Sequence, residues 1–172
     1  MEQGYQIEEI NQKEPRPKLL KIVCILSLIS IGLSFLGGVS QLFNGPVSDE
    51  DLLNQKVEIT KTVTKLVELD AGEYWILSVK KLIPMSESLN SSFYYVTILT
   101  LITSIVGFFG VLKMWQGFKI GFHFYIIYSL IGIGQIYLFV SPTSVPTFVV
   151  VWNTVLSGIF IFMYSRSLNW LK

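Results

Sequence analysis

The chain contains one cysteine and one histidine among its 172 residues, and charged residues make up only 15% of it. With Cys24 alone, it cannot form an intramolecular disulfide or a cysteine-ligated metal cluster. Soluble domains carry about 25% charged residues, and here no aspartate or glutamate follows Glu87, so the second half lacks the surface that water would require. A net charge of +1 also offers no basic face, and no nucleic-acid partner is expected.

Hydrophobic residues account for 51% of the chain and gather in four long runs. A helix needs about 20 apolar residues to cross a hydrocarbon layer about 30 Å thick. The runs lack the alternation of a membrane β-barrel strand, and backbone groups in lipid must bond within their own segment, so each run is predicted to be helical. We therefore expect an all-α, polytopic membrane protein. The predicted transmembrane helices are 19–43, 93–112, 118–140 and 145–164.

The long connection at 44–92 has five lysines against eight acidic residues and is net negative. The other lysines and arginines lie close to the ends of the runs. They precede the first run, lie between the second and third, and follow the fourth, whereas the connection SPTSVP at 141–146 is uncharged. Because basic loops stay in the cytoplasm, we predict a bacterial inner-membrane protein with both termini cytoplasmic and residues 44–92 outside. The other predicted segments are cytoplasmic tails at 1–18 and 165–172, a cytoplasmic turn at 113–117 and an outer loop at 141–144.

The first run could also be read as a signal peptide, because basic residues precede it and Gly38–Ser40 could pass for a cleavage site. A signal peptide has an apolar core of about 7–15 residues. The run at 19–43 is longer, which favours an uncleaved membrane span.

Residues 44–92 form the one long polar segment between apolar runs. Ser48, with Asp51 three residues later, is typical of a helix N-terminus. Apolar residues then recur at steps of three and four, which predicts amphipathic helix, and Pro84 is expected to end a second such stretch. We expect a helical hairpin or two short helices whose stripes pack on each other and on the span ends, or on a partner. The candidate contact residues of this outer module are Leu52, Ile59, Val63, Leu66 and Trp75.

Aspartate, glutamate, lysine and arginine are missing from the interior of the predicted spans. His123 has no second histidine, cysteine pair or carboxylate near it in the spans, and no phosphate-binding loop or nucleophile elbow is found. No catalytic, cofactor-binding or metal site is therefore predicted, and no enzymatic activity is expected. Gln135 and Asn153 are interpreted as hydrogen-bonding residues between helices.

Small residues recur at four-residue steps along the spans, and such rows let helix backbones approach closely in lipid. They fit packing within one four-helix bundle and equally a contact with a helix of another chain. Together with the two amides, the helix-packing candidates are Ser30, Ser34, Gly38, Thr103, Gly107, Gly132, Gln135, Asn153 and Gly158.

The stretch GVLKMWQGFKIGFHFYIIY at 110–128 joins the second and third predicted spans. Lys113, Lys119 and Trp115 suit the membrane surface, and Gly117 permits a tight reversal. This stretch resembles the hinge of small uncharacterised four-span bacterial membrane proteins of the Bacteroidetes type. The resemblance covers about the last 80 residues of the chain and is topological. Because that group has no established activity, the resemblance implies no site residue.

Two functions remain from the sequence. The first is a non-enzymatic accessory or scaffolding subunit of a larger membrane complex, which acts through helix packing and its outer module. Its expected partners are the lipid bilayer and other membrane proteins, or a second copy of the chain. The alternative is a small oligomeric transporter or channel. Several copies would be needed, because one copy offers no buried carboxylate and no ring of charged residues.

Overall fold

A computed structural model describes residues 15–172, of which 82% are helical and none lies in a strand. Four segments are long and apolar enough to cross a membrane. This confirms the prediction of an all-α protein with four helices of membrane-spanning length. These segments are α1 (Lys18–Asn44), α5 (Phe93–Trp115), α6 (Ile120–Gly134) with its continuation α7 (Ile136–Phe139), and α8 (Thr147–Ser165).

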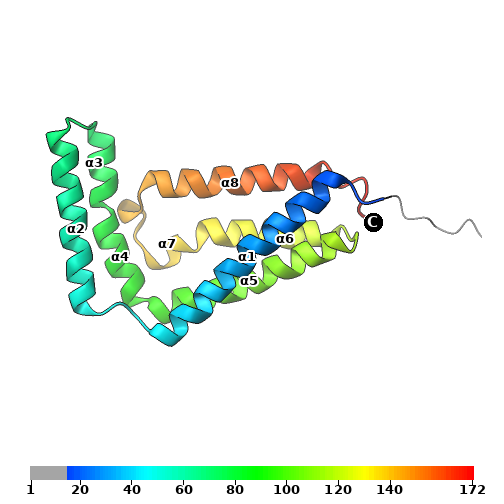
Figure 1. Cartoon of the computed structure of the whole chain (residues 1–172), viewed down its shortest axis with the longest axis horizontal. Coiled ribbons are helices and arrows are strands. Elements are labelled where there is room, and N and C mark those ends of the chain that lie inside the picture. The colour runs from blue at the N-terminus through cyan, green and yellow to red at the C-terminus, as the bar shows by residue number, and fades with distance from the viewer. Residues whose placement is uncertain (1–14) are drawn as a thin grey trace, which may run out of the picture.

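The four segments run along the long axis of the molecule (Figure 1). α5 packs along both α1 and α6, whereas α8 makes fewer contacts, with α6 and α1. α1 crosses the bundle obliquely, so it lies beside α8 at the end near the C-terminus and diverges from α8 toward the opposite end (Figure 1).

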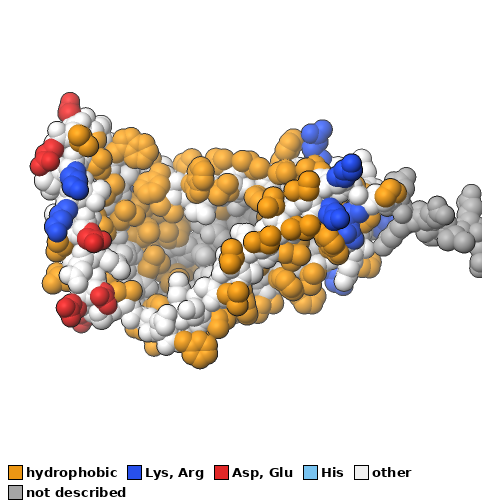
Figure 2. Space-filling view, in the orientation of Figure 1, with side chains coloured by type: hydrophobic (Ala, Val, Ile, Leu, Met, Phe, Trp, Pro, Cys, Tyr) orange, Lys and Arg blue, Asp and Glu red, His pale blue; other side chains and the backbone are white. Residues whose placement is uncertain are grey.

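Basic side chains gather, without acidic neighbours among the described residues, at one end of the bundle, which we call the basic end, while other lysines lie among the acidic side chains at the opposite end (Figure 2). The acidic side chains in view all lie at the opposite end, which we call the module end, on α2 (Asp49–Glu68), α3 (Glu73–Lys80) and α4 (Leu82–Ser91) (Figure 2). The best-buried hydrophobic cluster lies toward the basic end. Its members are Leu20, Val23, Cys24, Ile31, Val111, Met114, Tyr125, Tyr164 and Leu171.

Hydrogen bonds connect α8 to α1 within this cluster and fix both ends of the described chain near the cluster. Tyr164 on α8 donates its hydroxyl to Ser27 Oγ on α1 at 2.9 Å. The Lys172 N–H donates to the Gly117 carbonyl at 2.7 Å, which holds the C-terminus against the α5–α6 turn. Arg16 Nη2 donates to the Trp115 carbonyl at 2.8 Å, and its guanidinium lies 3.9 Å from the centre of the Trp115 ring. The basic end is therefore closed by α1, α5, α8 and the C-terminal residues together.

The turn between α5 and α6 depends on three glycines. Gly117 has φ of 92°, in the left-handed region that favours glycine. A Cβ on Gly121 would collide with the Gly110 carbonyl oxygen and lie 2.5 Å from the Met114 nitrogen, so the two helices touch backbone to backbone here. Helix α5 continues to Trp115, beyond the predicted end at 112, whereas α6 begins at Ile120, after the predicted start at 118.

Helices α2, α3 and α4 form the segment predicted as the outer module, which is a hairpin lying across the module end of the bundle (Figure 1). Ser48 accepts a hydrogen bond from the Asp51 N–H at 3.2 Å, as the N-terminal motif predicted. The expectation that Pro84 ends the second helical stretch is wrong, because helix continues to Ser91. Pro84 lies in the first turn of α4, where a backbone N–H would have no partner within the helix.

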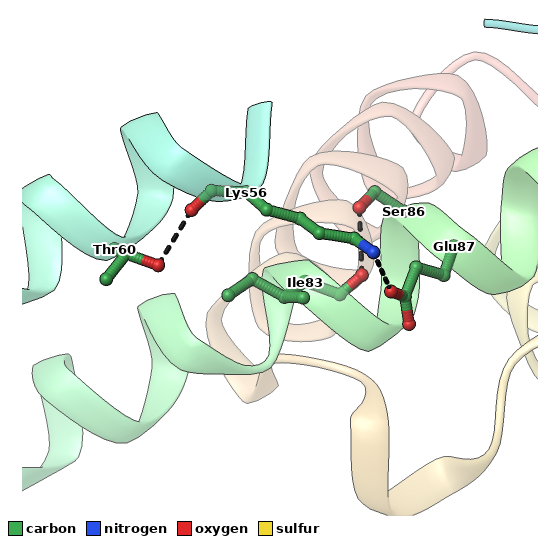
Figure 3. A network of polar contacts seen from close by, with 5 residues as sticks. All are labelled: Lys56, Thr60, Ile83, Ser86 and Glu87. Carbon is green, nitrogen blue, oxygen red and sulfur yellow. Dashed lines mark hydrogen bonds and ion pairs between the residues drawn. The ribbon is translucent and has the colours of Figure 1, made fainter. Parts of the chain in front are cut away.

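Polar contacts hold the module together and attach it to the span ends. Lys56 of α2 and Glu87 of α4 form an ion pair across the hairpin (Figure 3). The Asn90 side chain bonds both backbone groups of Val47, accepting from the N–H at 2.8 Å and donating to the carbonyl at 3.0 Å. The linker after α1 is thereby fixed to α4.

The third predicted span is also interrupted. α6 ends at Gly134 and α7 begins at Ile136, so Gln135 lies at a break inside the predicted helix 118–140. The predicted outer loop at 141–144 contains a short 3-10 turn, η1 (Pro142–Ser144), which contacts α4.

Candidate functional site

Beyond the hydrophobic cluster, the interior between α1, α5, α6 and α8 is hollow. Three adjoining pockets of about 180, 240 and 250 Å³ follow one another toward the module end and share lining residues. Figure 2 shows this hollow between α1 and α8. We call it the interhelical groove. Its polar lining consists of Ser27, Ser30, Ser34, Thr100, Thr103, Ser104, Tyr125, Tyr128, Ser129, Gln135, Asn153 and Ser157.

This lining consists of hydroxyl and amide groups, with no charged residue among the described residues that line the three pockets. On α5, Thr100, Thr103 and Ser104 donate their hydroxyl protons to carbonyls of their own helix, at 2.9, 2.7 and 2.8 Å. A hydroxyl has one proton and two lone pairs. These three oxygens therefore remain in the groove as acceptors.

The two amides in the groove do not bond other helices as predicted. Asn153 donates from Nδ2 to the Val149 carbonyl of its own helix at 2.8 Å. Gln135 Oε1 is buried and has no hydrogen-bond partner within the described part of the chain. The interpretation of both as hydrogen bonds between helices is therefore wrong for a single chain. Both amides line the same two pockets, so space lies between them where a hydrogen bond was expected.

The small-residue candidates fall into three groups. Gly38 and Gly107 lie at close helix contacts, where an added Cβ would come within 2.9 Å of Leu101 Cδ2 and 2.6 Å of the Tyr128 ring. Gly132 and Gly158 face open space, with no atom within 4 Å of an added Cβ. The remaining candidates, Ser30, Ser34 and Thr103, line the groove.

The outer-module candidates pack mostly within the module. Leu52, Ile59, Val63 and Leu66 are half-buried and share the face of α2 that carries Lys56 toward α4. Trp75 is 54% exposed, and its ring packs edge-on against Tyr74 with the centroids 5.3 Å apart. Packing within the hairpin, as expected from the sequence, therefore accounts for the apolar stripe on α2. It leaves Trp75 exposed to contact with lipid or another protein.

A further pocket of about 510 Å³ lies between the module and the module ends of α1 and α5. Leu89 and Val96 line this pocket and also the nearest part of the groove, so the two spaces adjoin. Sequence reasoning did not find either space, because serine and threonine in a span are equally compatible with packing against a neighbouring helix.

The described residues include no group of three His, Cys, Asp or Glu side chains that could hold a metal ion. His123 is exposed on α6, with Nδ1 3.3 Å from the Lys119 carbonyl of the same helix. It does not face the groove.

Comparisons with protein-family models, with curated proteins and with solved structures find no match to this chain. The functional interpretation therefore depends on the groove and on the arrangement of the helices around it.

Proposed function

We propose that the chain is a non-enzymatic accessory or scaffolding subunit of a membrane complex. Its four long helices cross a bacterial inner membrane, with the basic end in the cytoplasm and the module on the outer side. A transmembrane helix of a partner protein packs at the opening of the groove between α1 and α8. The basic residues at the basic end, and the net negative charge of residues 44–92 with five lysines against eight acidic residues, support this orientation.

The observation that carries the proposal is the buried Oε1 of Gln135, which has no hydrogen-bond partner among the described residues and shares a pocket with the hydroxyl oxygens of α5. An unpaired buried polar group costs about 1–3 kcal/mol, and lipid tails cannot form hydrogen bonds with Gln135 or with the hydroxyls of α5. A helix of a partner can, at about 0.6–2 kcal/mol for each bond gained. The groove therefore favours a protein neighbour over lipid.

The walls of the opening also suit a close neighbour. α8 is the least covered of the spans, with 6% of its most apolar stretch buried against 33% for α5. Ser30 and Ser34 on α1, and Ser157 and Gly158 on α8, are small residues that let another helix approach. Lipid-facing surfaces carry large apolar side chains instead, such as Trp152 and Phe162.

Photo-crosslinking in membranes tests this function. A photoreactive amino acid replaces Ser34 in one variant and Ser157 in another, and the control replaces Ile102, which is 54% exposed and lies outside the groove. We expect both groove positions to give one discrete protein adduct of the same partner, while position 102 gives lipid adducts. Lipid adducts at all three positions would contradict the proposal.

A second candidate function is transport of a small uncharged solute. One observation favours it, namely that the groove adjoins the larger pocket beneath the module and is closed by the hydrophobic cluster at the basic end. Purified protein in vesicles should then accelerate glycerol uptake, measured by light scattering after an osmotic step. Uptake at the rate of empty vesicles would exclude glycerol transport.

A further inference from the structure

We propose that the interhelical groove recognises its partner helix by hydrogen-bond donors, which insert between α1 and α8 and are received by acceptor oxygens of this chain. The inference rests on the proposed function and adds the chemistry of the partner. The partner helix should carry a side chain with an N–H or O–H at the level of Gln135 and Thr103, the two acceptors that line adjoining parts of the groove.

The first step is the direction of the hydrogen bonds on α5. The hydroxyl protons of Thr100, Thr103 and Ser104 are all donated to carbonyls one turn earlier in the same helix. Only lone pairs are left for a neighbour. This side of the groove can accept hydrogen bonds but has few protons to give.

The second step is the amide at the α6–α7 break. Gln135 Oε1 is a buried acceptor with no partner among the described residues. It shares two of the pockets with Asn153, whose side-chain nitrogen already donates to its own helix. The oxygens of α5 and Gln135 therefore form one acceptor-rich surface.

The third step is the absence of an internal partner for this surface. Among the described residues that line the groove, none is a lysine, arginine or histidine. The hydrophobic cluster that includes Met114 and Tyr164 lies between the groove and the basic end. Hydroxyl groups of Tyr128, Ser129 and Ser157 also line the groove, but none of them is a hydrogen-bond partner of Gln135 Oε1. The donor for this oxygen must therefore come from outside the described residues.

The fourth step is the kind of molecule that supplies the donor. The groove opens sideways between α1 and α8, where Ser34 and Asn153 line it and are nevertheless exposed. Acyl chains reach such an opening but carry no donor. Each part of the groove holds about 180–250 Å³, too little for a helix about 10–12 Å across, but enough for side chains. A partner helix therefore lies across the opening and inserts polar side chains.

Synthetic host helices provide the test. Polyleucine transmembrane peptides carry one central residue, either glutamine, N,N-dimethylglutamine or leucine, and their binding to the full-length labelled protein is measured by energy transfer in phosphatidylethanolamine–phosphatidylglycerol vesicles. The dimethyl amide keeps the acceptor oxygen but has no N–H. We expect the glutamine peptide to bind about 3- to 30-fold more tightly than the other two, as one hydrogen bond between helices allows.

Protein variants locate the effect. Thr103→Val keeps the shape of the side chain and removes the acceptor, so it should reduce the preference for the glutamine peptide. The matched control is Thr154→Val, which alters an exposed threonine of α8 outside the groove and should keep the full preference. Circular dichroism checks that both variants remain helical.

The inference is overturned if the dimethyl peptide binds as well as the glutamine peptide, if no peptide binds, or if both valine variants behave alike. Displacement of the glutamine peptide by glycerol would also overturn it, because a small solute would then occupy the groove. Persistent native crosslinks at Ser34 in any of these cases would leave the proposed function standing. Loss of those crosslinks with an intact glutamine preference would instead remove the proposed function and retain the donor preference.

Discussion

Replacing Gly121 by alanine should open the basic end of the bundle. The new Cβ would collide with the Gly110 carbonyl oxygen and lie 2.5 Å from the Met114 nitrogen and 2.9 Å from Lys113 Cβ. Two of these are backbone atoms of a continuous helix, which cannot move aside singly, so α5 and α6 must separate. Overpacking costs about 1–3 kcal/mol, and contact with backbone places Gly121→Ala at the upper end of that range.

The single cysteine provides the assay. Cys24 is fully buried in the hydrophobic cluster, so a thiol-reactive dye can reach it only when the basic end opens. A loss of about 3 kcal/mol should raise the labelling rate about 100-fold. The measurement is the labelling rate of the full chain in mild detergent, followed over increasing temperature.

Gly132→Ala is the matched control. It changes the same residue type in α6, about three helical turns further along nearly the same face, but no atom lies within 4 Å of its Cβ. Removing a glycine from a helix stabilises it by about 0.5–1 kcal/mol, so labelling of Cys24 should be unchanged or slower. Equal labelling rates in Gly121→Ala and Gly132→Ala would refute the backbone contact between α5 and α6.

Three further predictions concern the turn, the cluster and the module. Gly117→Ala should lower the midpoint of thermal unfolding, because φ of 92° costs an alanine about 1–2 kcal/mol, and an unchanged midpoint would argue against this turn. Tyr164→Phe removes the hydroxyl that α8 donates to α1 and should cost about 0.5–1.5 kcal/mol, seen as modestly faster cysteine labelling; wild-type labelling would mean that this bond contributes nothing. Asn90→Ala leaves two backbone groups of the linker after α1 without their partner, so protease should cleave this linker faster, whereas equal cleavage would place the anchor elsewhere.

Membrane topology is tested by cysteine labelling in a chain whose own cysteine is replaced by serine. Cysteines at Lys113 and at Asp49 should react with impermeant reagents from opposite sides of the membrane, as the charge distribution predicts. Reaction of both from the same side would overturn the proposed orientation.

The sequence predicts the four long helices well, because a continuous apolar run in lipid has few alternatives to helix. It also predicts the start of α2, since Ser48 and Asp51 act within one turn. The sequence does not predict which helix contacts form, because these depend on the atoms of another helix that lie opposite each residue. Gly121 and Gly132 look alike in the sequence, yet one touches the backbone of α5 and the other faces an open groove.

Gln135 shows the same limit at the candidate site. An amide within an apolar run predicts a hydrogen bond to another helix, because an unpaired amide in lipid is costly. The direction of α8 decides whether a partner is within reach, and that direction depends on contacts at the two ends of the span. No local pattern encodes it, so the groove and its acceptor surface emerge only from the structure.

The contacts of α8 lie mainly at its two ends, which bears on the free energy that the proposed binding of a partner helix would require. Its basic end is fixed through Tyr164 to α1, and its module end is preceded by η1, which contacts α4. Between these points α8 has only a limited contact with α6, so a small change in its tilt would widen the groove without breaking the hydrophobic cluster. The proposed binding of a helix there would require no rearrangement of the α1–α5–α6 core, and would preserve most of the free energy gained from each new hydrogen bond.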